Sequence, residues 1–148
     1  MVAREYTRNQ DYALVRLDRT VVGREPVKLA SQAPIPGEFL VLMGHPSGLP
    51  LKVAGNAHVR KIEEGFFVAT TDSYGGNSGS PVLKASTLEV AGILVRGDQD
   101  YDFDYAKQCV ASKICEEDKC RGEDITMIDF IQKALAQQNQ TPVANTQQ

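Results

Sequence analysis

The sequence predicts an all-β fold, a barrel or a sandwich, followed by one helix. Apolar and β-branched residues alternate in short runs, glycine and proline separate these runs, and a single late segment has helical spacing. The runs expected as strands are 12–17, 39–43, 52–59, 66–70, 81–84 and 88–95. Short strands at this spacing are typical of barrels and sandwiches. The residues expected in turns are Pro34, Pro36, Gly37, Pro46, Gly48 and Pro50.

The late segment 125–136 is expected to be the helix. Its apolar residues recur three or four positions apart, which places them on one helical face. These residues are Ile125, Ile128, Ile131 and Leu135. Asp124 precedes them and is expected to be the N-cap, because its carboxylate can accept the free N–H groups of a first turn. The polar residues 138–148 are expected to form a disordered tail.

The composition is that of an ordinary globular domain and argues against nucleic-acid and membrane binding. The 148 residues are 42% hydrophobic and carry a net charge of −3, and the 16 lysines and arginines are scattered rather than clustered. Such a pattern does not follow a phosphate backbone. No apolar run approaches the roughly 20 residues of a membrane-spanning helix. The first ten residues, MVAREYTRNQ, also lack the apolar centre of an export signal.

The segment 72–82, DSYGGNSGSPV, is the most informative part of the chain. By itself a glycine- and serine-rich stretch predicts a β-turn, but the whole string resembles the nucleophile motif of the trypsin/chymotrypsin-like serine endopeptidases. Its GNSGSP form is most similar to the bacterial glutamyl-endopeptidase branch. The resemblance implies that Ser78 is the nucleophile and that the N–H groups of Gly76 and Ser78 form the oxyanion hole. Asn77 replaces the aspartate that precedes the serine in digestive members, so control by a cleaved propeptide would differ.

Asp11 begins the string DYALVRL, which alone is an ordinary strand start. Given the nucleophile motif, the string resembles the strand that the triad aspartate opens in this family, which implies that Asp11 accepts the histidine Nδ1–H. The family order is histidine, aspartate, serine, yet His45 and His58 both follow Asp11. His45 is expected to be structural, and His58 to be a strand residue.

We therefore expect the triad histidine, most of a first barrel and an export signal to lie upstream of Asp11 in a longer protein. The resemblance implies a double antiparallel β-barrel, of which this chain would hold the second barrel and the end of the first, with a C-terminal helix. The expected parts are the end of the first barrel (1–24), a linker (25–36), the second barrel (37–124), the helix (125–137) and the tail (138–148). The chain as given is expected to be inactive.

The resemblance also indicates the residues of a specificity pocket. Asp72 stands six residues before Ser78, where members that cleave after lysine or arginine carry a carboxylate. The second wall is expected in AGILVRG, 91–97, which gives Leu94, Arg96 and Gly97 as substrate-binding candidates. Leu94 stands where glutamate-specific members have a histidine. Arg96 is expected either to pair with Asp72 or to be solvated, and preference for a basic residue ranks ahead of preference for glutamate.

The cysteines favour a disulfide over a metal site. Cys109, Cys115 and Cys120 are too widely spaced for the CxxC pattern of zinc sites, so a disulfide across one short loop is expected, in an exported enzyme. No cofactor or metal is expected.

The function expected from these observations is a serine endopeptidase that acts on peptide or protein substrates, secreted or periplasmic in its complete form. The alternatives are a catalytically dead homologue that serves as a binding module, and a trypsin-fold protease with an appended peptide-binding domain. A dead homologue would have no need for the glycines around Ser78, and a glutamine-rich tail offers no further domain.

Overall fold

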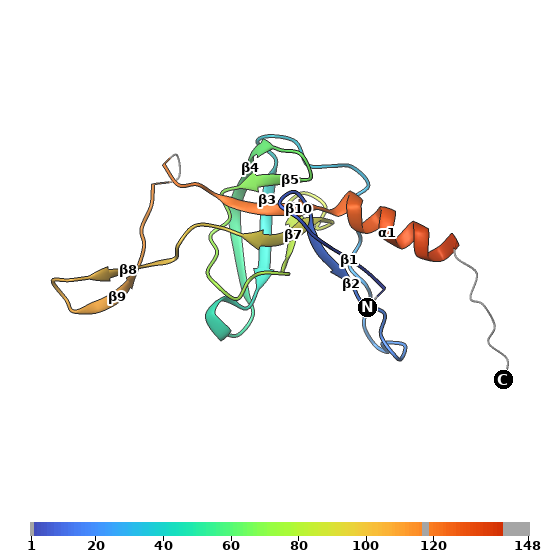
Figure 1. The fold of residues 1–148 in the computed structure, drawn as a ribbon, viewed down its shortest axis with the longest axis horizontal. Helices are drawn as coiled ribbons and strands as arrows, with labels where there is room; N and C mark the ends of the chain where they lie inside the picture. The colour runs from blue at the N-terminus through green and yellow to red at the C-terminus, as the bar shows by residue number, and fades with distance from the viewer. Residues whose placement is uncertain (1, 117–118, 141–148) are drawn as a thin grey trace.

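The computed structural model describes residues 2–116 and 119–140, and its centre is a closed six-stranded antiparallel barrel (Figure 1). Around the barrel the strand order is β10-β5-β4-β3-β6-β7. These strands are β3 (Phe39–Gly44), β4 (Lys52–Ile62), β5 (Phe66–Ala69), β6 (Pro81–Lys84), β7 (Val90–Arg96) and β10 (Glu123–Met127). A short 3₁₀ turn, η1 (Pro46–Gly48), follows β3. The expectation of an all-β barrel with a C-terminal helix is confirmed.

Alternation of side chains along the strands fills the barrel interior. In β3, Leu40 and Leu42 are buried, whereas Phe39 on the other face is largely exposed. Phe67 of β5 and Ile125 of β10 are fully buried in the same cluster. The long β4 changes register against both of its neighbours, and such irregularities increase the strand curvature that closure needs.

A second apolar cluster joins the barrel to helix α1 (Ile128–Gln140). Ile128 and Ile131 of the helix pack against Val90 of β7 and against Ala30, which belongs to the segment before the barrel. That segment is fastened by backbone bonds, since Ala30 N–H donates to the Val90 carbonyl at 2.9 Å. The start of the helix therefore packs against the barrel and the entering chain, and the rest of the helix extends away from the barrel (Figure 1).

The helix begins at Ile128, three residues later than expected, and Asp124 is not its N-cap. Ile125 lies inside β10, where its side chain points into the barrel, and Asp124 is a buried member of the same strand. The N-cap prediction was wrong because β10 passes directly into α1 without a turn residue to separate them. The helix continues through Gln140, into the residues expected as tail, and residues 141–148 lie outside the described part of the chain.

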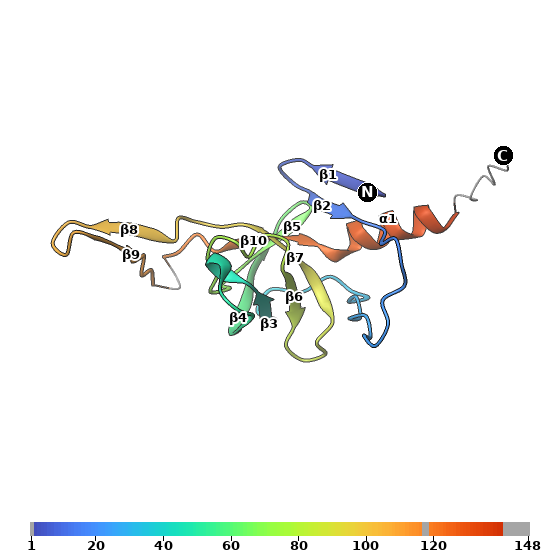
Figure 2. The same cartoon turned by 90° about the horizontal axis from the view of Figure 1, so that it is seen from below.

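Two hairpins leave the barrel (Figure 2). The first pairs β1 (Ala3–Tyr6) with β2 (Asp11–Leu14), and the second pairs β8 (Tyr101–Asp104) with β9 (Cys109–Ser112). The β8–β9 hairpin extends away from the barrel at the end opposite α1. Its base contacts the loop before β6, because the Tyr101 ring lies 5.4 Å from that of Tyr74.

Within the described residues, no helix combines the length and the apolar character needed to cross a membrane.

Candidate active site

The loop between β5 and β6 presents Ser78 at the surface. Gly76 has a φ of 98°, a conformation that residues with a Cβ rarely adopt. A Cβ at Gly76 would also lie 3.1 Å from the Ser47 nitrogen, so a side chain there would require η1 to shift by a few tenths of an ångström. Among the described residues, the N–H groups of Gly76 and Ser78 have no hydrogen-bond acceptor. They are therefore available to a ligand oxygen, as an oxyanion hole requires.

Asn77 anchors this loop from within. Its side chain is buried, and its Nδ2 donates to Ser73 Oγ at 3.2 Å. Gly44 of β3 makes room for it, because a Cβ there would overlap the Asn77 Oδ1 and Ser80 Oγ atoms. Asn77 thus holds the turn that presents the neighbouring serine.

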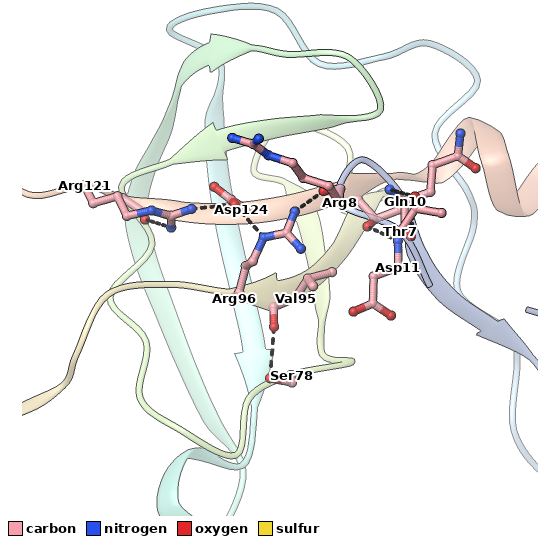
Figure 3. Close-up of polar contacts among 11 residues, drawn as sticks. Thr7, Arg8, Gln10, Asp11, Ser78, Val95, Arg96, Arg121 and Asp124 are labelled. Atoms are coloured by element: carbon pink, nitrogen blue, oxygen red, sulfur yellow. Dashed lines mark hydrogen bonds and ion pairs between the residues drawn. The ribbon is translucent and has the colours of Figure 1, made fainter. Parts of the chain in front are cut away.

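Ser78 and Asp11 line the same cleft, which has a volume of about 540 Å³ and lies between the first hairpin and β7. Figure 3 shows the two side chains on the same side of β7. The Asp11 backbone N–H donates to the buried Thr126 Oγ1 at 3.2 Å, which fixes the start of β2 against β10. The Ser78 hydroxyl donates to the Val95 carbonyl at 3.2 Å (Figure 3). A backbone carbonyl cannot remove the proton, so the serine in this arrangement is not activated.

Neither histidine lines this cleft. His45 directly precedes η1, and its Nδ1 lies 3.1 Å from the Leu49 carbonyl. His58 lies in β4, with its Nδ1 3.3 Å from Thr70 Oγ1. The Ser78 hydroxyl bonds the Val95 carbonyl and not a histidine ring.

Arg96 connects the first hairpin to the barrel (Figure 3). Its Nε donates to Asp124 Oδ2 at 2.8 Å, and its NH2 group donates to the Arg8 carbonyl in the turn between β1 and β2. The same Asp124 oxygen accepts from Arg121 at 2.6 Å. Arg96 was expected either to pair with Asp72 or to be solvated. Both expectations were wrong, because Arg96 forms its ion pair with the buried Asp124.

A small pocket of about 100 Å³ opens beside Ser78. Leu94, Arg96 and Gly97 line it together with residues 73–75, and their part in substrate binding stays a prediction. Asp72 is exposed and lines a larger adjoining hollow of about 490 Å³, so its part in substrate binding stays a prediction.

Sequence reasoning missed three acidic residues of the small pocket, Asp98, Asp100 and Glu123. Glu123 opens β10, and Asp98 and Asp100 lie in the connection from β7 to β8, so none of them belongs to a segment that carried a motif.

The cysteines form one disulfide, between Cys115 and Cys120, which agrees with the expectation of a bridge across a short loop. Cys109 is exposed and reduced. In residues 2–116 and 119–140, no group of three or more potential ligands is arranged to hold a metal ion.

Comparisons with known proteins agree with this fold and identify the family of the chain. Among solved structures, the chain is similar to an inactive serine-to-alanine mutant of Rv3671c from M. tuberculosis, with 15% identity and a TM-score of 0.56 over 83% of this chain and 58% of that one. The active form of the Rv3671c protease gives the same identity and TM-score over 82% and 51% of the two chains. This chain therefore spans little more than half the length of those chains.

At this identity the structural likeness concerns the fold. No curated protein matches the sequence significantly. The model of the trypsin-like peptidase domain matches residues 1–93, more than half of the chain, and the chain therefore belongs to the trypsin-like peptidase family.

Proposed function

We propose that the chain is the catalytic part of a serine endopeptidase, with Ser78 as nucleophile and Asp11 as triad acid. The observation that carries the proposal is the shared cleft: Ser78 comes from the barrel and Asp11 from the hairpin before it, and the two side chains line one hollow although they are far apart in the sequence. Since neither His45 nor His58 lines that cleft, the proposal needs a histidine from a segment upstream of Asp11 in the complete protein.

The chemistry follows from the roles of these groups. The histidine takes the Ser78 proton as the hydroxyl attacks the peptide carbonyl, and Asp11 accepts the histidine Nδ1–H and stabilises the imidazolium. The N–H groups of Gly76 and Ser78 bind the resulting oxyanion. The histidine then protonates the leaving amine, and a water molecule hydrolyses the acyl-enzyme by the same steps.

The finer parts of the proposal rest on the sequence. The GNSGSP form of the loop supports a place nearest to the bacterial glutamyl-endopeptidase branch. An endopeptidase of that kind would act on proteins or peptides outside the cytoplasm, so we propose that the complete protein is secreted or periplasmic. The disulfide between Cys115 and Cys120 is compatible with an oxidising compartment.

The second candidate is a catalytically dead homologue that binds peptides without cleaving them. The observation in its favour is the bond from the Ser78 hydroxyl to the Val95 carbonyl, which leaves the nucleophile without a base among the described residues. A dead homologue would keep the cleft as a binding surface and would not require an upstream histidine.

A fluorophosphonate probe distinguishes the two candidates. The complete protein should be labelled stoichiometrically on Ser78, because an activated serine attacks the phosphorus, and Ser78→Ala should abolish the labelling. Ser112→Ala is the matched control, since Ser112 is exposed on β9, away from the cleft, and should change nothing. A complete protein that is folded but neither labelled nor able to cleave a denatured protein would support the dead homologue.

A further inference from the structure

The small pocket beside Ser78 has the dimensions of a site for one side chain. Its volume of about 100 Å³ is well below the roughly 300–1,000 Å³ of pockets that hold drug-sized ligands. Residues 73–75 and 96–98 line it together with Ser78, Leu94, Asp100 and Glu123, and five of these lining residues also line the adjoining hollow of about 490 Å³. A substrate side chain next to the bond attacked by Ser78 would therefore enter this pocket.

Gly97 lets the carboxylate of Glu123 lie in this pocket. A Cβ at Gly97 would overlap both carboxylate oxygens of Glu123, so the missing side chain leaves the space that the carboxylate occupies. The two residues come from opposite ends of the connection between β7 and β10, which brings them together at the barrel rim. The acidic group thus comes from β10, not from the loop before Ser78.

The charges around the pocket leave Glu123 without an ion pair in the described part of the chain, and the nearby Arg121 pairs with Asp124 at 2.6 Å. Arg96 forms an ion pair with Asp124 at 2.8 Å, and Lys113 forms one with Asp98 at 3.1 Å. Asp100 accepts the Gly75 N–H at 2.6 Å but has no ion pair in the described part of the chain. Glu123 likewise makes no ion pair among the described residues. Burial without a counter-charge is costly, so a cation is the ligand that this pocket favours.

We propose that the pocket selects a lysine or arginine side chain of the substrate and that Glu123 is the residue that determines this preference. The proposal rests on the proposed endopeptidase function and extends it to a substrate class. A guanidinium or ammonium group in the pocket would donate hydrogen bonds to the Glu123 carboxylate and would also be attracted by the negative charge of Asp100. An acidic substrate side chain would meet both carboxylates and be repelled.

This preference should depend on pH. Burial, then the neighbouring charges of Asp100 and Asp124, raises the pKa of Glu123 to about 7, although Arg121 and a backbone bond from Asp98 lower it. The titratable and charged groups that line the pocket with Glu123, or the hollow adjoining it, are Arg60, Asp72, Tyr74, Arg96, Asp98, Asp100 and Lys113. A cation should therefore bind more tightly as the pH rises through about 7, when Glu123 ionises.

The test compares Glu123→Gln with the matched control Glu64→Gln in the complete protein. Glu64 is exposed in the turn between β4 and β5, so its substitution removes the same charge outside the pocket. In paired peptides that differ only at the residue before the cleaved bond, the ratio of kcat/KM for arginine to that for leucine should fall about ten- to hundred-fold in Glu123→Gln, the size of a lost charged hydrogen bond. Glu64→Gln should keep the wild-type ratio, and an unchanged ratio in Glu123→Gln would refute the proposal.

Benzamidine, a small aromatic cation, tests the pocket without catalysis. Its dissociation constant, measured by calorimetry at pH 8, should rise at least ten-fold in Glu123→Gln and remain unchanged in Glu64→Gln. A protein that no fluorophosphonate labels but that binds benzamidine through Glu123 would contradict the proposed function and keep the pocket assignment. A protein that is labelled on Ser78 but binds benzamidine equally well with and without the Glu123 carboxylate would support the proposed function and refute the pocket assignment. Thermal melting of each variant checks that it is folded.

Discussion

Replacing Arg96 by methionine should release the hairpin that carries Asp11 from the barrel. The lost bond from the guanidinium to the Arg8 carbonyl, its contact with the hairpin, is a charged hydrogen bond worth about 1.5–3 kcal/mol. The bond to Asp124 and the contact with the Phe66 ring, 5.6 Å from its centroid, hold the guanidinium in place from the barrel side. We therefore expect opening of the hairpin to become easier by about 2 kcal/mol.

Amide hydrogen exchange in the complete protein measures this loss locally. The Thr7 N–H, which bonds the Gln10 carbonyl in the hairpin turn, should exchange about 30-fold faster if opening becomes 2 kcal/mol easier. Amides of the barrel strand β4 should change much less. Catalysis should fall as well, because the hairpin places Asp11 in the cleft.

Arg121→Met is the matched control. Arg121 bonds the same Asp124 oxygen but makes no bond to the hairpin, so it should destabilise the barrel without accelerating exchange at Thr7. Equal acceleration in both variants would show that the charge of Asp124, not the bond to Arg8, controls the hairpin, and the reasoning would fail.

Three further results are expected. Asp11→Asn in the complete protein should lower kcat by about 10⁴-fold while fluorophosphonate labelling of Ser78 slows in parallel, by analogy with the family's triad; an undiminished kcat would remove Asp11 from the triad. The folded-state pKa of Glu123 is raised from 4.5 to about 7, so its contribution to stability is fully present below pH 4.5 and is lost as the pH rises through about 7. The free energy of unfolding in urea should therefore decline over this pH range, and Glu123→Gln should remove the decline. Gly44→Ala should cost about 1–3 kcal/mol in urea unfolding, because the added methyl group overlaps Asn77 Oδ1, and a neutral effect would mean that the loop can shift.

The barrel was predictable from the sequence because the signals of its strands and turns are local, whereas Ser78 and Asp11 were singled out by a family resemblance and their catalytic roles stay predictions. The alternation in β3 and the glycines around Ser78 each act within a few residues, where periodicity and turn chemistry can be recognised. The helix was also predicted, but its start was wrong. Ile125 and Ile128 are three apart, which fits a helix, while Ile125 actually points into the barrel from the last strand.

The acidic pocket was not accessible, because closure of the barrel creates it. Glu123 lies far from Ser78 in sequence and reaches its neighbourhood only because β10 pairs with β7. The partner of Arg96 was missed for the same reason, since Asp124 is directly opposite Arg96 in that pairing. The β8–β9 hairpin gave no signal either: its strands are mostly exposed, so no buried face imposes an apolar alternation.

The connection 97–122 leaves and re-enters the barrel at residues that face each other. Arg96 and Asp124 are direct partners in the pairing of β7 with β10, so a tight turn of about two to five residues would close the ring as well. The long excursion is therefore an insertion that the barrel does not need for its own closure. What it adds lies at its base, where Asp98 and Asp100 border the pocket and Tyr101 contacts the loop that carries Ser78. Changes in its outer length leave the pairing of β7 with β10 intact, whereas changes at its two ends alter the pocket beside Ser78.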